Sequence, residues 1–502
     1  MTDVPFSWLL AVACVLLIAN VLYYSVFESV YITNIRNVVR DFRDHRYYRP
    51  WAPKPIMIPA TKKIMTELSE TSVLSQRAVY SDLFGFKHTL NGADHYEVNT
   101  RKSRLLSRVL QVRGPTQFEE LYPYLLHHLK TILDVGPSSG GTASVRLALF
   151  SETILSRLMG AWFFGGNMTS DPRLRDALLN HPRQIKACSA AFQLTPRFIA
   201  PLVHAMITWR GSAMHLIQDR LIDVITAGID NLDEKPEIKK VWAKILGFCC
   251  SMGSTQANEH GPQLTLLYHM VDLSTADRSY WTPERLSQSL LGLWLAASHQ
   301  PWVNLHAILV ELCLRPEWQD ALRNEALQSQ DDLASKINEL PLLDSFMRET
   351  ARVNSLDKIA IRRKALTDYS FSSAPLSIPA GSILCVSSYD ATRNEHIYPD
   401  PEKFDGKRFL NGRCKDTSHK FADVSENHLI WGYGSLAWFA HPGRHHAAFM
   451  IKIVVVHIVT NYTLRLADHE APRWWTWEDF RMPFASTRVL FSKRATEDDG
   501  SS

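Results

Sequence analysis

The sequence has few cysteines, and none of them are spaced as in a disulfide framework or a metal site. Seven occur in 502 residues, at positions 14, 188, 249, 250, 313, 385 and 414, with no CxxC motif. A disulfide framework or a zinc site needs paired cysteines at short, regular spacings. The odd number and irregular spacing instead predict reduced, buried thiols in a protein that faces the cytosol.

The chain also lacks a stripe of one charge. Its 55 basic and 51 acidic residues give a net charge of +4 and are spread along the whole length. A nucleic-acid-binding protein usually carries a clustered basic surface, so no nucleic-acid partner is expected. No internal repeat or low-complexity linker interrupts residues 60–493, and 46% of all residues are hydrophobic. We therefore predict one large domain over 60–493, followed by a short polar tail, 494–502, expected to be disordered.

Residues 1–27 are predicted to be a transmembrane anchor. From Ser7 to Phe27 the chain is almost entirely apolar and long enough to cross a hydrocarbon core of ~30 Å. Five arginines follow this segment, and positive charge on that side favours a cytoplasmic body. We expect a single-pass protein of the endoplasmic reticulum whose body faces the cytosol. In that orientation the glycosylation patterns at Asn167 and Asn461 would stay unmodified.

Residues 28–59 are basic and then rich in proline, ending in RPWAPKPIMIP. Closely spaced prolines make a stiff connector, so this segment is predicted to be a linker between the anchor and the body.

The body is mainly helical by pattern. Residues 118–133 and 210–229 carry apolar residues at spacings of three and four, as amphipathic helices do. A longer helix is predicted over 283–314, capped by Thr282 and kinked between Ala297 and Pro301, because proline removes a backbone hydrogen bond. The region after residue 360 has strand-like and irregular patterns, and a final helix is expected from His445 to Val459.

Three motifs in this order point to a known family. Glu349-Thr-Ala-Arg352 matches an ExxR helix, PDPEKFDGKRF contains Arg408, and WGYGSLAWFAHPGRHHAAF runs from Trp431 to Phe449. Together they resemble a membrane-anchored cytochrome P-450 of fungal secondary metabolism. The resemblance implies a mainly α P-450-like fold with a small β-rich region. It also implies a structural cluster of Glu349, Arg352 and Arg408.

The haem-ligand loop departs from the family pattern. In the family this loop holds a cysteine whose thiolate binds the haem iron. An alignment from the WGYG side places Trp438 at that position, and an alignment from the PGR side places His441 there, with three extra residues between them. The extra residues are either a genuine in-frame insertion or an error in the gene model. Neither alignment supplies a thiolate.

A second departure lies in the long central helix. The family's oxygen-site signature, [AG]Gx(acid or His)T, corresponds to Ala296-Ala-Ser-His-Gln300, so that Gln300 replaces the threonine which helps to deliver protons to oxygen. Both changes concern oxygen activation, while the structural motifs remain. The sequence therefore predicts a retained fold without thiolate-haem oxygen chemistry, and no cofactor is expected.

Three functions follow as alternatives. The first is a non-oxidative cyclase or isomerase, for example of Diels–Alder type, that folds an apolar, terpenoid-like intermediate, with His299 and Gln300 as catalytic donors to a carbonyl. The second is a haem monooxygenase or peroxidase-like enzyme that uses a reductase. In this enzyme His441 would ligate iron, and the cofactor would also be held by Arg362, Arg363 and Arg444. The third is a non-catalytic partner of an active membrane enzyme.

Overall fold

The fold is known from a computed structural model. It describes residues 46–47, 55–90, 117–133, 142–209, 211–232, 265–274, 277–410, 413–416, 418–434, 441–477 and 479–494. The anchor predicted over 1–27, and all of the tail predicted over 494–502 except Arg494, lie outside these residues.

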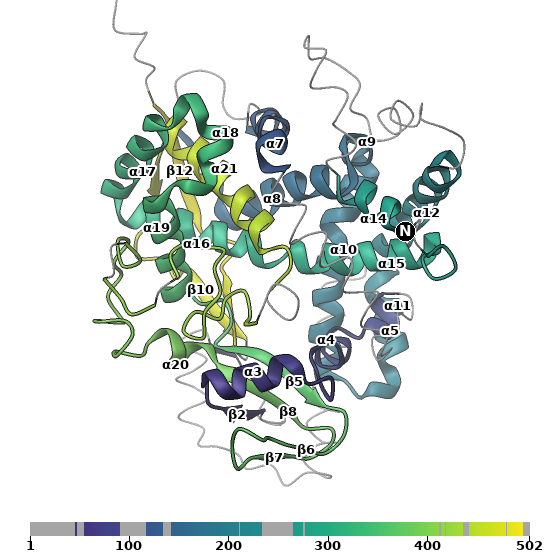
Figure 1. The fold of residues 1–502 in the computed structure, drawn as a ribbon. Coiled ribbons are helices and arrows are strands. Elements are labelled where there is room, and N and C mark those ends of the chain that lie inside the picture. The colour runs from purple at the N-terminus through teal and green to yellow at the C-terminus, as the bar shows by residue number, and fades with distance from the viewer. Residues whose placement is uncertain are drawn as a thin grey trace, which may run out of the picture.

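Helices make up most of the described chain (Figure 1). The longer ones are α7 (Phe118–Leu133), α8 (Leu147–Phe164), α10 (Pro172–Leu194), α12 (Ala213–Leu232), α15 (Pro283–Ala297), α16 (Gln300–Leu314), α17 (Pro316–Gln328), α19 (Pro341–Val353) and α21 (Arg444–Asn461). Shorter ones are α3 (Lys62–Glu70), α4 (Gln76–Phe84), α5 (Phe86–Thr89), α9 (Gly166–Ser170), η3 (Arg197–Ile199), α11 (Ala200–Thr208), α14 (Leu266–Ser274), η5 (Gln330–Asp332), α18 (Leu333–Lys336), η6 (Ile337–Glu339) and α20 (Ser388–Thr392).

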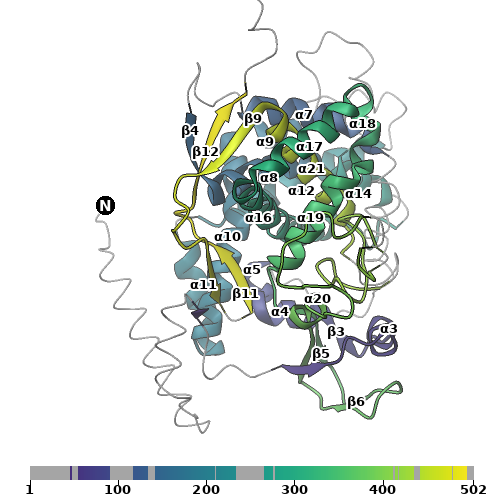
Figure 2. The same cartoon turned by 90° about the vertical axis from the view of Figure 1, so that its left-hand side faces the viewer.

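The strands form small sheets at the edges of the helical body (Figures 1 and 2). The four-stranded sheet has the order β2 (Ile56–Ile58), β8 (Ile383–Ser387), β5 (Ile359–Ala365) and β3 (Leu74–Ser75). A three-stranded sheet has the order β4 (Thr142–Arg146), β12 (Arg488–Lys493) and β9 (Tyr462–Leu466). A second one has the order β1 (Arg46–Tyr47), β10 (Trp474–Trp477) and β11 (Phe480–Pro483). In the smallest sheet, β6 (Tyr369–Ser370) pairs with β7 (Ser377–Ile378). Because β1 and β2 pair with β10 and β8, the linker predicted over 28–59 includes two strands of the folded body.

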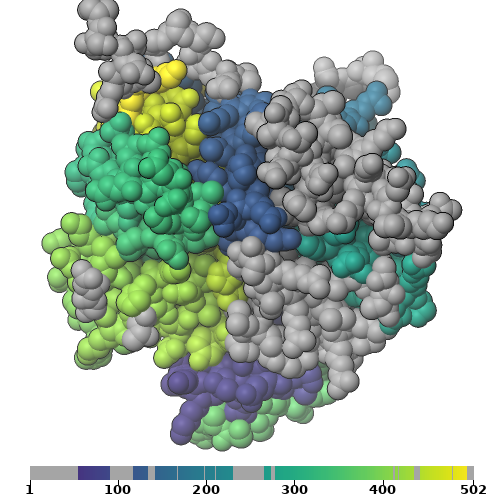
Figure 3. Space-filling view, turned by 45° about the horizontal axis from the view of Figure 1, so that its top comes forward, coloured from purple at the N-terminus to yellow at the C-terminus, as the bar shows by residue number. Residues whose placement is uncertain are grey.

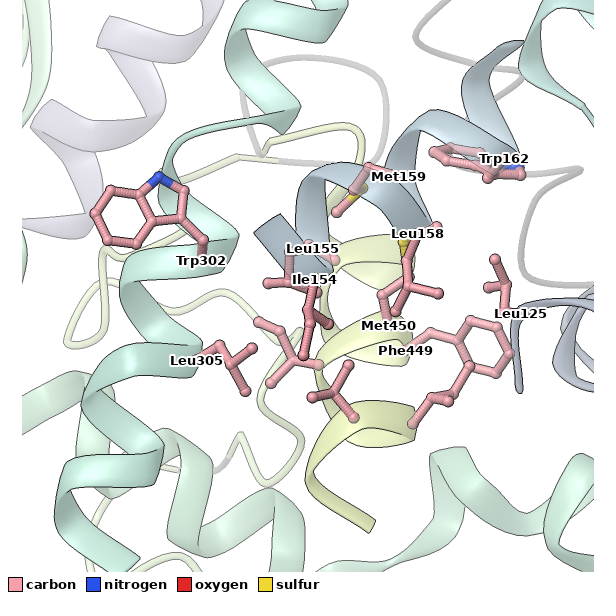
Figure 4. Packing of buried hydrophobic residues seen from close by; sticks show 14 of the residues in the cluster. Leu125, Ile154, Leu155, Leu158, Met159, Trp162, Trp302, Leu305, Phe449 and Met450 are labelled. Atoms are coloured by element: carbon pink, nitrogen blue, oxygen red, sulfur yellow. The ribbon is translucent and has the colours of Figure 1, made fainter. Parts of the chain in front are cut away.

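The main core lies where α8, α16 and α21 meet. Figure 4 shows Leu155 and Leu158 of α8 facing Phe449 and Met450 of α21, with Leu305 of α16 beside them. All five side chains are buried. Burial of such a side chain contributes roughly 1.5–3 kcal/mol, so these three helices hold the centre of the molecule together. In the space-filling view, the blue segment around α7 and α8 lies against the green and yellow C-terminal half (Figure 3).

A smaller core lies between α3 and the four-stranded sheet. It contains Ile64 and Leu68 of the helix and Leu384 and Val386 of β8. This second cluster fixes the sheet against its own helix, at the lower edge of the molecule in Figure 1.

The helix pattern read from the sequence is confirmed. The predicted helix over 118–133 is α7, and the predicted final helix is α21, which is longer by one residue at its start and by two at its end. Thr282 caps α15 as expected, since its Oγ1 accepts from the backbone N–H of Arg285 at 3.4 Å. The four strands β9 to β12 after residue 461 were not predicted.

One helix among the described residues is long and apolar enough to cross a membrane. This is α8, Leu147–Phe164, and 61% of its apolar window is buried inside the molecule. Since α8 packs in the main core, its hydrophobicity reflects burial in the protein.

Candidate functional site

The central helix is interrupted where the sequence predicted a kink. α15 ends at Ala297, and His299, with φ −110° and ψ −65°, stands between it and α16, which begins at Gln300. Pro301 occupies the first turn of α16, where the missing N–H leaves no partner unsatisfied. The N–H of Ser298 still donates to the carbonyl of Trp294 at 2.9 Å. The proline therefore ends one helix and starts another with little loss of hydrogen bonding.

One face of α15 borders open space just before this break. A Cβ added at Gly292 would meet no atom within 4 Å, and Ala296, four residues later on the same face, is exposed. By contrast Leu290, Leu291 and Leu295 are buried. The last turns of α15 therefore present small residues to an open space, and the helix break with His299 follows two residues after Ala297.

His299 is neutral at physiological pH. Burial lowers the pKa of its imidazole to about 3, with a further contribution from the charge of Lys186. Its Nδ1 is buried and has no hydrogen-bond partner among the described residues. The neighbouring Gln300 is half-buried, and only its backbone carbonyl is engaged, by Nδ2 of Asn304 at 2.9 Å. Two polar side chains at the break thus retain hydrogen-bonding capacity.

The structure brings Glu349, Arg352 and Arg408 together. Arg352 donates from Nε and Nη2 to the Glu349 carboxylate at 2.7 and 2.9 Å, and Arg408 Nε donates to the same group at 3.0 Å. Arg352 also donates to the carbonyl of Pro401, which ties α19 to the following irregular segment. The cluster is buried, so its role is structural. It is separate from the site at the helix break.

The described ends of the loop before α21 lie close together. Gly432 and Gly434 have φ of 78° and 128°, backbone conformations that favour glycine. The backbone N–H of His441 donates to the carbonyl of Trp431 at 2.7 Å, closing the loop at its base. Trp438, the residue that one alignment places at the ligand position, lies outside the described residues.

His441 sits in the base of this loop. Its ring centroid is 5.8 Å from that of Trp431, and its Nδ1 is buried with no partner among the described residues. Burial, and then the charge of Arg444, lower the pKa of His441 to about 4. Arg444 donates from Nη1 to the carbonyl of His441 at 3.4 Å. His441 is therefore a neutral imidazole.

A bulge in β5 turns two successive arginines inward. The pairing with β8 shifts between Ala360 and Arg363, and Ile361 adopts φ 54°, which is strained for a β-branched residue. Arg362 is ion-paired with Asp357, so its charge is already compensated. Arg363 donates to the carbonyl of Arg362 at 3.0 Å, and burial lowers its pKa to about 10. Of the two proposed anion-binding arginines, Arg362 is thus already paired with a carboxylate.

The residues present do not fit a thiolate-bound haem. The sequence from Trp431 to Phe449 contains no cysteine. Elsewhere in the described chain, burial raises the pKa of the Cys188 thiol to about 11 and those of Cys313 and Cys385 to about 12. The Cys414 thiol, whose pKa burial also raises, donates to the carbonyl of Asp416. These thiols therefore stay protonated, whereas an axial ligand must be a thiolate.

The comparison with protein families shows to which family the chain belongs. The model of the cytochrome P-450 family matches residues 150–479, which include the ExxR helix, the helix break and the loop before α21. The chain belongs to the cytochrome P-450 family. A solved structure, retinoic acid-bound cyanobacterial CYP120A1, shares the fold with a TM-score of 0.51 at 16% identity, covering 77% of this chain and 78% of that one.

Three similar proteins come from fungi, and two of them are named as cytochrome P-450 monooxygenases. Pyrichalasin C-7 hydroxylase of Pyricularia grisea is 34% identical over 210 residues, which are 38% of this chain and 41% of the relative. Over that match the chain thus spans about two fifths of the relative's length. The monooxygenases paxP of Penicillium paxilli and penP of Penicillium crustosum match at 22% and 25% identity, each over 86% of this chain and 79% of the relative.

Two residues beside the helix break escaped the sequence analysis. Lys186 of α10 and Trp302 of α16 lie near His299, with the lysine Nζ 5.6 Å from the centre of the Trp302 rings. Lys186 is remote in sequence, and both read as ordinary residues of amphipathic helices.

Proposed function

We propose that this member of the cytochrome P-450 family is an enzyme of fungal secondary metabolism that closes or rearranges rings without oxidation. The proposed reaction is a Diels–Alder-type cyclisation of an apolar, terpenoid-like intermediate. The observation that carries the proposal is the break in the central helix, where His299 and Gln300 retain hydrogen-bonding capacity beside an open face. The loop that would hold a thiolate contains no cysteine.

Conformational restriction of the substrate by the shape of the site would supply most of the rate enhancement. An open face of small residues, Gly292 and Ala296, bordered by buried leucines, suits a flexible hydrocarbon chain. Holding such a chain in a reactive conformation removes entropy before the reaction starts and can lower a barrier by up to ~7–11 kcal/mol. No electron donor or oxygen is needed for this effect.

Hydrogen bonding to a substrate carbonyl would add to it. With a pKa of about 3, His299 cannot act as an acid at neutral pH, but its neutral ring can donate a hydrogen bond. The amide of Gln300 is a second donor at the same break. Such a bond withdraws electron density from a conjugated alkene and is worth ~1–3 kcal/mol in a buried site.

The test begins with the metabolite that accumulates when the gene is deleted in its host. This compound is purified and incubated, without oxygen, with membranes that contain the full-length protein and with a boiled control. The proposal predicts a product of unchanged molecular mass, formed without NADPH or a reductase. A product that gains oxygen or loses hydrogen, and that forms only with NADPH and oxygen, contradicts it.

A haem enzyme with an altered ligand is the second candidate. It is favoured by the names of the fungal relatives and by one atom, the buried Nδ1 of His441, which has no partner among the described residues. Imidazole lacks the electron donation of a thiolate, so peroxidase-like or weak oxygenase activity would be expected. Purified protein with a haem absorbance that disappears in His441→Ala would favour this candidate.

We also propose that the protein lies on a membrane of the endoplasmic reticulum. Besides the apolar segment before residue 28, the short helices η3 and α11 expose Phe198, Leu202 and Trp209 at 80%, 62% and 67%. Large exposed apolar side chains on neighbouring turns mark a contact surface. A truncation that removes residues 1–27 should still bind lipid vesicles weakly, and Phe198→Ser with Leu202→Ser should abolish that residual binding. Glycan attached at Asn167 in cells would contradict the cytosolic orientation.

A further inference from the structure

Two buried nitrogen atoms without a hydrogen-bond partner, and one half-buried ammonium group, lie beside the helix break. Nδ1 of His299 and Nε1 of Trp302 are both buried and have no hydrogen-bond partner among the described residues. The Nζ of Lys186 lies 5.6 Å from the centre of the Trp302 rings, and no described carboxylate lies within 4 Å of it. The rings of His299 and Trp302 are centred 6.0 Å apart. All three groups thus gather in one small volume.

Positive charge is in excess at this place. The nearest acidic residue that acts on Lys186 is Glu152, but its carboxylate is held by Arg183 at 2.6 and 3.2 Å. Arg183 and Lys186 together carry two positive charges against the one negative charge of Glu152. Burial lowers the pKa of Lys186, which indicates that its ammonium group lacks full compensation.

The chemistry of the donors defines the missing partner. Lysine and tryptophan nitrogens only donate, and a neutral histidine donates through Nδ1 in one tautomer. A water molecule finds an acceptor among these groups only when the His299 proton is on Nε2, and it brings no charge to offset that of Lys186. A group with acceptor oxygens only and a single negative charge satisfies all three.

We propose that Lys186, His299 and Trp302 bind the carboxylate of an otherwise apolar small molecule. Figure 4 shows Trp302 pointing away from Leu155 and Leu158, with its indole nitrogen on the side of the ring toward the start of α16. The carboxylate would thus lie at the break itself, next to the open face that begins at Gly292. The inference rests on the proposed function only in taking the substrate as the natural occupant.

This assignment gives the two residues of the break, His299 and Gln300, different roles. His299 helps to anchor the substrate's acid group, so it is a binding residue. Gln300 remains to donate to the reacting carbonyl. The substrate is then an acid, and the enzyme that supplies it must leave a carboxyl group at one end of the apolar chain.

Binding of dodecanoate and methyl dodecanoate to the full-length protein in detergent tests the site without any turnover. Both probes have the same chain, and only the acid carries a charge. Isothermal titration should show the acid binding at least roughly tenfold more tightly, since a charge-assisted hydrogen bond is worth more than ~1.4 kcal/mol. Lys186→Met and Trp302→Phe should each remove most of this preference and leave binding of the ester unchanged.

Lys130→Met serves as the matched control, because Lys130 is exposed on α7. Displacement of dodecanoate by acetate at a similar concentration would identify a site for small anions only and overturn the proposal of an apolar acid. Equal affinity of acid and ester, or an unchanged preference in Lys186→Met, would also overturn it. Because no reaction is measured, these outcomes are independent of whether the proposed cyclisation occurs.

Discussion

Arg352 grips the carboxylate of Glu349 with two parallel hydrogen bonds of 2.7 and 2.9 Å, and neither side chain is exposed. A bidentate pair of this kind, three residues apart on one helix, is rigid and costly to break when it is buried. The strict geometry is kept in a chain whose ligand loop has no cysteine. The structural cluster of the family is thus present beside a ligand loop without cysteine.

Breaking this pair should be strongly destabilising. Glu349→Gln leaves the charges of Arg352 and Arg408 buried without a counter-charge, and we expect a loss of about 3–5 kcal/mol in the free energy of unfolding. Urea denaturation of the detergent-solubilised protein measures it. Lys336→Ala, which breaks an exposed pair with Asp332, is the control and should leave the midpoint unchanged. Equal midpoints for both variants would show that the buried pair is not structural.

Filling the open face of α15 should affect binding more than stability. Gly292→Leu places its side chain where a Cβ meets no atom within 4 Å, so the melting temperature should stay constant or rise. The same substitution should raise the KM for the accumulated metabolite, because it occupies space for the substrate. Gly406→Ala is the contrast: its Cβ would lie 2.3 Å from Trp318, and overpacking of ~1–3 kcal/mol should lower the melting temperature. A destabilised Gly292→Leu with unchanged KM would refute the open face.

Features set by interactions within one helix turn could be predicted from the sequence, whereas features set by contacts between distant segments could not. Thr282 and Pro301 act on their own helix turns, so the cap and the break could be read from the sequence. β12 was missed because its partner β4 lies more than three hundred residues earlier, so only folding brings the two short strands together. Lys186 was missed for the same reason, since only folding brings α10 to the helix break.

The arginines proposed for a cofactor show the same limit. The sequence places Arg362 and Arg363 together, but it does not reveal the bulge at Ile361 or the pairing of Arg362 with Asp357. The surroundings of the two arginines are set by a local backbone irregularity. Such irregularities have no periodic pattern that a sequence could display.

Substitutions at the two residues of the helix break should have different effects on kcat and KM. Gln300→Ala should lower kcat about tenfold or more, because the donor to the reacting carbonyl is lost, with little change in KM. His299→Ala should mainly raise KM if it anchors the acid group. Initial rates over a range of metabolite concentrations distinguish the two. If both variants keep wild-type kcat and KM, shape alone accounts for the rate and neither residue has the proposed role.

Acid should destabilise the protein through buried neutral histidines. Burial lowers the pKa of His181 to about 4 and that of His306 to about 3, against 6.5 in the unfolded chain. The unfolded state therefore takes up protons first, so stability is complete above pH 6.5 and falls as the pH drops toward the folded pKa. Each such histidine costs about 1–2 kcal/mol at pH 5.

Urea unfolding at pH 7.5 and pH 5 measures this loss. His181→Leu removes one titrating group, so its stability should fall less between the two pH values than that of the wild type. His396→Gln replaces an exposed histidine and should behave like the wild type. An equal pH dependence in all three proteins would show that His181 is protonated in the folded state.

The central claim, that this cytochrome P-450 scaffold lacks a thiolate-bound haem, is tested most directly by the absorbance of the reduced protein under carbon monoxide. The matched variant replaces Trp438 to His441 with a single cysteine, which restores the family's loop spacing. The account predicts no thiolate-type red-shifted Soret band from the native protein, and the appearance of that band in the cysteine variant. A strong thiolate-type band from the native protein would contradict the account and return it to the haem monooxygenases.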